Sequence, residues 1–342
     1  MGNTTGRKFP KVVTLGVIVL LAAAVLGGTA CRQEPPPAAG PPEKITLAYP
    51  TTMLSVLTHI AYRKGYFLAE GLEVTPQLHP FGKPALRAVL DGKADLAVVA
   101  DTPIMFAVTG GEKIAILAVT GTSRRAVSIV ARRDRGIAKA ADLKGKRIGV
   151  PLGTTGDFFL DSLLTVQGID RRKIRIVDLK PEEMLNALRQ GKVDAVSIWN
   201  PTRRKIEAAL QENGVRIDDD NIYSDVSCLA ARGDYVARHP ETVRKALRAL
   251  LRAETFVRTR PAEAREITAA LTGIDPSSVR EIWGLYTFQV LLDQALIVSL
   301  EDQTRWAVRQ GLTPRREMPN YLDFIYTEGL LAVRPEAVRI IR

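Results

Sequence analysis

The sequence predicts an α/β protein of two similar lobes, each with a mainly parallel sheet and flanking helices, with a ligand cleft between them. Two observations carry this prediction. A segment of helix and strand occurs twice at a spacing of 99 residues, and in each half apolar strand-like runs alternate with helix-like ones, as is typical of parallel sheets. A third observation, the character of the first residues, indicates export.

The first 30 residues are typical of an export signal. Three basic residues lie within the first 11 positions, and an uncharged, almost wholly apolar run over residues 12–26 follows them. This run is short for a membrane span and has the usual length of a signal-peptide core. We therefore expect residues 1–30 to be a signal peptide.

Cys31 directly follows four small residues, Gly-Gly-Thr-Ala. The arrangement resembles the lipobox of bacterial lipoproteins, whose cysteine thiol receives a diacylglycerol, except that Gly28 stands where the lipobox prefers leucine. We expect lipid attachment at Cys31, which would anchor the exported chain to a membrane. An ordinary secretory signal with a chance cysteine is the alternative.

Residues 31–43 are expected to be an extended tether. Proline and small residues dominate this segment, and proline-rich sequences stay extended because they cannot pack. The folded part then begins near Lys44 and has roughly 300 residues, which exceeds one small core and favours two domains.

The composition excludes several classes of protein. Hydrophobic residues make up 46% of the chain and charged residues 25%, as in ordinary globular proteins. No segment after the signal is apolar for long enough to span a membrane. The net charge of +11 is scattered, and the amphipathic helix expected at 240–259 places Arg244, Arg248 and Arg252 on one solvated face. We therefore do not expect nucleic-acid binding.

The repeated segment aligns without gaps. LRAVLDGKADLAVVAD at 86–101 matches LNALRQGKVDAVSIWN at 185–200. Each copy reads as a helix ended by a glycine, Gly92 or Gly191, and then a short apolar strand that ends in a polar residue.

The similarity extends upstream, so that each half reads strand, turn, helix, strand, helix, strand. The first half has strands at 45–49 and 72–77, a Pro-Thr-Thr turn at 50–52 and a helix to about 64; the second has strands at 147–150 and 173–179, a turn at 151–156 and a helix at about 157–167. Two long copies fit two lobes rather than a solenoid, which needs several short copies.

Open α/β sheets bind ligands beyond the carboxyl ends of their strands, at helix N-termini. Two lobes that face each other gather the residues at these positions around one cleft. The candidate ligand-binding residues are Tyr49, Thr51, Thr52, Met53, Asp101, Thr102, Thr154, Thr155, Gly156, Asp157, Trp199 and Asn200.

The turn that opens the second half is the most informative of these features. Backbone N–H groups and the hydroxyls of Thr154 and Thr155 at a helix N-terminus attract an anion or a carbonyl oxygen, and the alternative is that a threonine only caps the helix. Asp101 and Asp157 either cap helices or receive an amine or amidine of the ligand. Trp199 is either a core residue or a flat wall of the site.

Several segments resemble one family. DLKGKRIGV at 142–150 resembles a segment common in type II periplasmic binding proteins, where it follows the first crossing between lobes. HIAYRKGYFLAEGLEV at 59–74, GTTGDFFLDSLL at 153–164 and DLKPEEMLNALRQGKVDAVSIWNP at 178–201 look like the nitrate/sulfonate/taurine and thiamine-precursor binding superfamily of ABC importers. The resemblance covers about residues 44–210 well and the C-terminal part loosely.

The resemblance implies a two-lobed type II periplasmic-binding-protein fold with a cleft between the lobes and two hinge crossings. We place the crossings near 126–132 and 227–232. Lobe one is expected at 44–128 and lobe two at 129–228, and residues 229–342 return to lobe one and add C-terminal helices. Hinge closure traps the ligand in two-domain binders of this kind.

In function, the resemblance implies an extracytoplasmic substrate-binding lipoprotein of an ABC importer. It would face the periplasm or the extracellular side as a monomer, without a cofactor, and deliver a small molecule to a permease. The ligand class would be a small organic anion or zwitterion, such as a sulfonate or taurine, or a nitrate-like anion. A thiamine pyrimidine precursor as ligand and a sensing module coupled to a membrane receptor are the alternatives.

An enzyme is disfavoured by the sequence. His59, His79 and His239 are far apart and form no metal-binding spacing. The chain has no Walker loop, no G-x-S-x-G and no strand followed by G-x-G-x-x-G. Cys228 lies in an apolar run and is expected to be a buried small hydrophobe.

Overall fold

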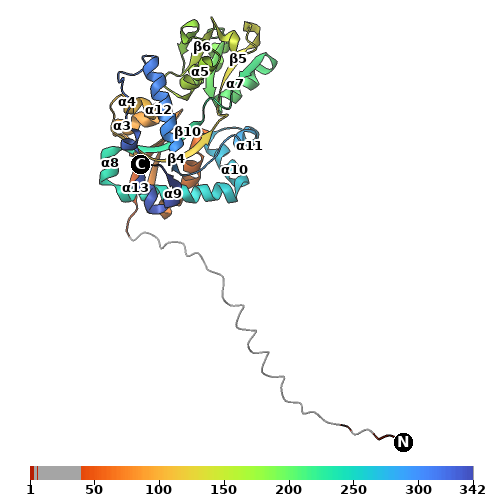
Figure 1. The fold of residues 1–342 in the computed structure, drawn as a ribbon, viewed down its shortest axis with the longest axis vertical. Helices are drawn as coiled ribbons and strands as arrows, with labels where there is room; N and C mark the ends of the chain where they lie inside the picture. The colour runs from red at the N-terminus through yellow and green to blue at the C-terminus, as the bar shows by residue number, and fades with distance from the viewer. Residues whose placement is uncertain (4–5, 7–39, 342) are drawn as a thin grey trace. The chain divides into compact units, whose positions relative to one another are not determined.

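Two five-stranded sheets organise the residues that the computed structural model describes, which are 1–3, 6 and 40–341 (Figure 1). All of their strands lie within one unit, Ala38–Arg342. The predicted signal core, Cys31 and the tether up to residue 39 lie outside the described residues, so these expectations remain predictions.

The first sheet defines lobe one and has the strand order β2-β1-β3-β10-β4. β1 is parallel to both β2 and β3, whereas β10 is antiparallel to β3 and β4. The strands are β1 (Glu43–Pro50), β2 (Leu72–His79), β3 (Leu96–Ala100), β4 (Ile114–Ser123) and β10 (Asp225–Arg232).

The second sheet defines lobe two and repeats this arrangement in the order β7-β6-β8-β5-β9. β6 is parallel to β7 and β8, and β5 is antiparallel to β8 and β9. The strands are β5 (Val127–Arg132), β6 (Arg147–Val150), β7 (Arg175–Asp178), β8 (Ala195–Trp199) and β9 (Gly214–Ile217). The predicted fold, two similar α/β lobes with mainly parallel sheets, is confirmed.

Helices connect and flank these strands, and most of the C-terminal ones belong to lobe one (Figure 1). The helices are α1 (Val56–Arg63), α2 (Tyr66–Ala69), α3 (Gly82–Leu90), α4 (Asp101–Thr109), α5 (Thr155–Val166), α6 (Met184–Arg189), α7 (Thr202–Leu210), α8 (Gly233–Arg238), α9 (Pro240–Thr259), α10 (Pro261–Thr272), α11 (Pro276–Trp283), α12 (Gln294–Arg309) and α13 (Thr327–Val333). A short pair, β11 (Leu292–Asp293) and β12 (Val338–Arg339), joins the end of the chain to the start of α12.

The aspartate of the repeated Gly-Lys-x-Asp motif holds two parallel strands together in each lobe. In lobe one, the carboxylate of Asp95 accepts the backbone N–H of Thr46 at 2.7 Å. In lobe two, Asp194 accepts the backbone N–H of Arg147 at 2.9 Å and also pairs with its guanidinium. The glycine that precedes this aspartate, Gly92 or Gly191, has a φ near +70°, which side-chain-bearing residues rarely adopt. The motif is therefore a structural signal that ends a helix and fixes the next strand.

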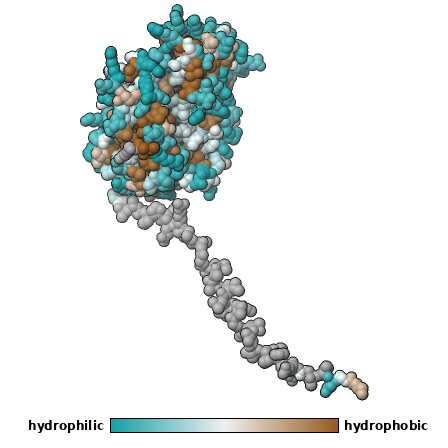
Figure 2. Space-filling view, in the orientation of Figure 1, coloured by the Kyte–Doolittle hydropathy of each residue, from teal (hydrophilic) through white to brown (hydrophobic). Residues whose placement is uncertain are grey.

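The amphipathic helix predicted at 240–259 is α9. Its apolar face packs against α1, α2 and α13. Its arginines are less free than a solvated face implies: Arg248 donates to Glu70 at 2.7 Å, and Arg244 pairs with Glu241 at 3.2 Å. Figure 2 shows hydrophilic side chains interspersed with smaller apolar areas over the visible face. No helix among the described residues has the length and apolar character that crossing a membrane requires.

The apolar runs expected to be hinge crossings are strands. Residues 127–132 form β5 and residues 225–232 form β10, each inside a sheet. The chain passes from one sheet to the other just before each strand, at 124–126 and 218–224. These runs are apolar because strands inside a sheet are buried on both faces. The short crossings that precede them need not be buried on both sides.

Candidate functional site

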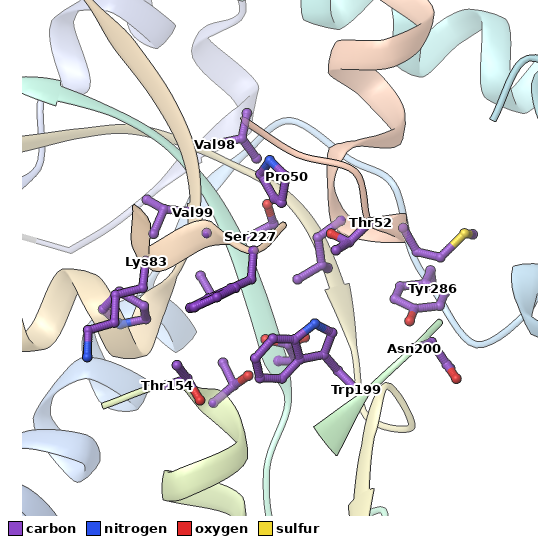
Figure 3. A pocket seen from close by; sticks show the side chains of 18 residues that line it. Pro50, Thr52, Lys83, Val98, Val99, Thr154, Trp199, Asn200, Ser227 and Tyr286 are labelled. Atoms are coloured by element: carbon purple, nitrogen blue, oxygen red, sulfur yellow. The ribbon is translucent and has the colours of Figure 1, made fainter. Parts of the chain in front are cut away.

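A pocket lies where the carboxyl ends of β1, β3 and β8 meet the start of α5 (Figure 3). It contains about 510 Å³ of empty space, part of it open to solvent. Its walls come from both lobes and are mainly apolar. They are formed by Pro50, Thr52, Met53, Leu54, Phe81, Gly82, Lys83, Val98, Val99, Ala100, Pro103, Thr154, Thr155, Trp199, Asn200, Asp225, Ser227 and Tyr286.

The twelve candidate residues separate into two groups in the structure. The pocket wall includes Thr52, Met53, Thr154, Thr155, Trp199 and Asn200. The other candidates do not line it: Tyr49, Thr51, Asp101, Thr102, Gly156 and Asp157. Six of the twelve candidates thus lie together at one pocket, and their role in ligand binding stays a prediction.

The first contact across the pocket is aromatic. The ring of Phe81, at the N-cap of α3 in lobe one, lies 6.2 Å from the indole of Trp199 in lobe two, tilted by 51°. Figure 3 shows the Trp199 indole in the middle of the lining, between Thr154 and Tyr286 in this view. Trp199 is thus a wall of the pocket that also packs against the apolar cores.

A second contact crosses between the lobes at the pocket's edge. Lys83 belongs to α3, and its Nζ donates to the backbone carbonyl of Leu152 at 2.8 Å. Leu152 lies in the turn before α5. The described arrangement is therefore closed at this edge.

The N-terminus of α5 reaches the pocket with two threonines in different states. Thr154 donates its hydroxyl to the carbonyl of Pro151 at 2.6 Å, so it fixes the turn and does not cap the helix through its side chain. The Thr155 hydroxyl has no hydrogen bond within the described chain and lines the pocket. Gly156 lets the helix approach β8, since a Cβ there would lie 2.9 Å from the carbonyl oxygen of Ser197.

Asp157 lies behind this turn and is fully engaged. Its carboxylate accepts the backbone N–H of Gly153 at 3.0 Å and the guanidinium of Arg171 at 2.6 Å. The side chain is 1% exposed. Asp157 therefore holds the turn in place as a cap and does not face the pocket.

Asp101 is engaged in the same way by distant parts of the chain. Its carboxylate accepts hydrogen bonds from Tyr223 at 2.5 Å, Ser299 at 2.7 Å and Gln303 at 2.6 Å, and from the N–H of Thr102 at 2.9 Å. Burial raises the pKa of Asp101 to about 6, against the opposing effect of these hydrogen bonds. The residue joins the start of α4 to the second crossing and to α12.

The sequence interpretation missed the polar residues that β10 brings to the pocket. Asp225 and Ser227 lie at the start of this strand, both at most 2% exposed. The Oδ1 of Asp225 has no hydrogen-bond partner among the described residues. A lone acid at the edge of the apolar run 226–231 was the available signal, but the pairing of β10 with β3 was not visible locally.

Asn200 connects the pocket to a buried arginine. Its Oδ1 accepts from Nε of Arg203 at 3.2 Å, and Arg203 also donates to Ser128 at 2.8 Å. The Nδ2 of Asn200 is buried and unpartnered in the described structure. Tyr286 stands beside Asn200 (Figure 3), and burial raises the pKa of its hydroxyl. These side chains can orient polar groups of a ligand.

The described residues contain no cluster of side chains suited to a metal ion. His59 is buried against Tyr49, with ring centroids 5.2 Å apart, and burial lowers its pKa to about 4. Cys228 is buried in β10, as predicted, and burial raises the pKa of its thiol. Neither side chain lines the pocket.

The fold and the pocket define a class of protein, the two-lobed type II periplasmic binding proteins. Within this class the chain belongs to the family described as NMT1/THI5 like, which matches residues 56–264. A putative binding protein of Brucella abortus is 26% identical over 226 residues, which are 65% of this chain and 69% of the relative. A putative aliphatic sulfonates-binding protein of Bacillus subtilis is 26% identical over 231 residues, 65% and 68% of the two chains.

A solved structure has the same fold over most of its length. The alkanesulfonate-binding protein of Xanthomonas axonopodis pv. citri, bound to MOPS, superposes with a TM-score of 0.70 at 21% identity. The match covers 89% of this chain and 100% of that one.

Proposed function

We propose that the chain is the substrate-binding component of an ABC importer and captures a small organic solute between its lobes. The observation that carries the proposal is a pocket whose apolar walls and few polar groups come from both lobes, the usual composition of a small-molecule site. Relatives named for sulfonate or taurine binding support the same class of solute. The solute would reach a permease as the lobes reopen.

The site favours an organic ligand over a bare inorganic anion such as nitrate. The apolar side chains of Met53, Leu54 and Phe81 form part of the wall and suit the carbon skeleton of an organic solute. The N-terminus of α5 supplies backbone N–H groups and the free hydroxyl of Thr155, which suit a sulfonate or another oxygen-rich group. We assign the anionic or carbonyl end of the ligand to this helix end.

A flat heteroaromatic ring, such as a thiamine pyrimidine precursor, is a second candidate. The observation that favours it is the aromatic pair Phe81 and Trp199, whose rings both line the pocket. Stacking on an aromatic wall adds to the free energy gained from area burial. The two candidates share the solute-binding function and differ in the ligand.

Export and lipid anchoring complete the proposal. The predicted signal at 1–30, Cys31 and the tether at 31–43 would hold the two lobes near the permease. Cys31→Ala should release the mature chain into the soluble exported fraction, measured by fractionation and by mass for the diacylglycerol. A wild-type chain that lacks this mass and stays soluble would exclude the anchor.

Ligand binding is tested directly with named solutes. Taurine, ethanesulfonate and 4-amino-5-hydroxymethyl-2-methylpyrimidine are titrated calorimetrically and by thermal shift, since a bound ligand raises the melting temperature. Trp199→Phe should weaken binding or change the indole fluorescence response, and Trp283→Phe, outside the pocket lining, is the matched control. Failure of all three solutes at millimolar concentration would contradict the proposed ligand classes.

A further inference from the structure

The crossing into β10 delivers a carboxyl group to the pocket. Asp225 is the first residue of β10 and pairs with Ser123 of β4 through the backbone. Its side chain lines the pocket together with Asn200 and Ser227. The position belongs to lobe one, whereas α5 belongs to lobe two, so the two polar parts of the lining come from different lobes.

Asp225 differs from the other buried acids near the pocket because one of its two carboxyl oxygens has no partner in the described structure. It is 2% exposed, and its Oδ1 has no hydrogen-bond partner among the described residues. Asp101 has four donors and Asp157 has two. Buried polar groups without partners are rare in folded proteins and point to a functional role. An unpartnered carboxyl oxygen in a ligand pocket is available to a ligand.

The surroundings decide what kind of ligand group suits this carboxyl. No basic side chain in the described ranges forms an ion pair with Asp225. Burial raises its pKa well above the usual range, and the negative charge of Asp101 adds to the rise. Tyr223 donates its hydroxyl to Asp101 and also holds the pKa of Asp225 down against the effect of burial, and Tyr286 is a further titratable neighbour of Asp225. The Oδ1 atom accepts a hydrogen bond from a ligand N–H in either protonation state, and a cationic ligand group would also favour the ionised form of the carboxyl.

We propose that Asp225 is a specificity-determining residue that receives an N–H donor of the ligand, so that the pocket prefers amino- or ammonium-bearing organic molecules to analogues without nitrogen. This inference rests on the proposed solute-binding function. It divides the ligand into two ends: an oxygen-rich end at the α5 N-terminus and Thr155, and a nitrogen end at Asp225. Simple alkanesulfonates then satisfy only half of the site.

Two isosteric pairs of probes test the preference. Taurine is compared with propane-1-sulfonate, in which a methyl group replaces the ammonium, and 4-amino-5-hydroxymethyl-2-methylpyrimidine with its 4-methyl analogue. In the wild type, the nitrogen-bearing member of at least one pair should bind at least tenfold more tightly by calorimetry. Asp225→Leu, which keeps the volume and removes the acceptor, should reduce this ratio to within about twofold.

Stability separates a binding role from a structural one. Asp225→Leu should leave the melting temperature of the empty protein unchanged or raise it, because it removes an unsatisfied buried group, whereas the milder Asp225→Asn removes the charge, keeps a polar side chain and should change the melting temperature little. Asp194→Asn is the control: its buried carboxylate is bonded to Arg147 outside the pocket lining, so the variant should lose stability and keep the nitrogen preference.

The outcomes are distinct. Equal binding of the two members within both pairs, or a preference that survives in Asp225→Leu, overturns the role of Asp225 and leaves the solute-binding function in place. A loss of more than about 5 °C in both Asp225 variants makes the residue structural and overturns the inference. If no probe of either pair binds the wild type, the proposed ligand classes and the inference fall together.

Discussion

Thr154 and Thr155 are adjacent in the sequence and have different roles in the structure. The pattern Gly-Thr-Thr-Gly before an apolar helix predicted a polar turn, and both residues line the pocket. Only the hydroxyl of Thr154 is used within the protein, by Pro151. Local sequence cannot separate the two because the difference lies in the direction of each side chain.

This difference predicts opposite effects of the two valine substitutions. Thr155→Val should weaken binding of an identified ligand about tenfold, which is about 1.4 kcal/mol, with little change in stability. Thr154→Val should cost about 1 kcal/mol of unfolding free energy through the lost hydrogen bond. Calorimetry and urea unfolding measure the two effects. Unchanged affinity in Thr155→Val would remove its hydroxyl from the site.

His59 predicts a pH dependence of stability. Burial lowers the pKa of His59 to about 4, whereas in the unfolded chain it is near 6.5. Between these values the unfolded state binds the proton more readily, so stability falls as pH decreases from about 6.5 to 4, by about 3 kcal/mol in total.

His59→Phe should keep the ring packing against Tyr49 and remove this part of the acid sensitivity. The comparison is made by urea unfolding at several pH values between 4 and 7. A variant with the same pH slope as the wild type would show that His59 is not the responsible group. Asp101 opposes the trend, since burial raises its pKa to about 6 and its ionisation costs stability as pH rises from about 4 to 6.

At the scale of elements, the sequence predicted what is local and missed what is distant. The repeated helix and strand were visible because periodicity, the C-cap glycines and apolar runs lie within about 16 residues. The antiparallel placement of β5 and β10 was not visible, because each strand inserts beside a partner far away in the chain, as β10 does next to β3. For the same reason the sequence could not show that Tyr223 and Gln303 satisfy Asp101.

The repeated aspartates predict that equivalent substitutions destabilise both lobes. Asp194→Ala removes the acceptor of the Arg147 N–H and a contact with its guanidinium, and leaves a buried donor unsatisfied. It should cost about 2–3 kcal/mol of unfolding free energy. Asp95→Ala loses only the bond to Thr46 and should cost less, about 1–2 kcal/mol. Urea unfolding of both variants checks the order, and equal or negligible losses would contradict the strand-pinning role.

For the whole molecule, the described arrangement is held closed by contacts between lobes on several sides. Lys83 reaches Leu152 at the edge of the pocket, Gln310 at the C-terminal end of α12 donates to Asp161 of α5 at 3.1 Å, and Arg204 of α7 pairs with Glu281 of α11. A ligand that enters the pocket must break at least the contacts at its edge. Aromatic contacts also cross between the lobes, such as Phe158 of α5 with Trp306 of α12, whose ring centroids lie 5.3 Å apart.

The final prediction concerns the hydrogen bond between Lys83 and Leu152 at the pocket edge. Lys83→Met keeps the aliphatic chain and removes the hydrogen bond to the Leu152 carbonyl. The open state lacks this hydrogen bond, so the substitution destabilises the closed state relative to the open one. Ligand dissociation should accelerate by roughly three- to tenfold, with little change in the association rate, because interface changes act mainly on dissociation. Stopped-flow Trp fluorescence measures both rates.

Small-angle scattering gives the matching structural measurement. Addition of ligand should make the wild-type protein more compact, and Lys83→Met should need more ligand to reach the same compaction, since a ligand shifts the population toward the state that binds it. Lys146→Met is the control, because Lys146 makes the same kind of bond, to the carbonyl of Arg135 at 2.6 Å, within lobe two. If scattering does not change with ligand and Lys83→Met matches this control, the pocket fills without lobe closure, and the Lys83 bond is a fixed part of the interface.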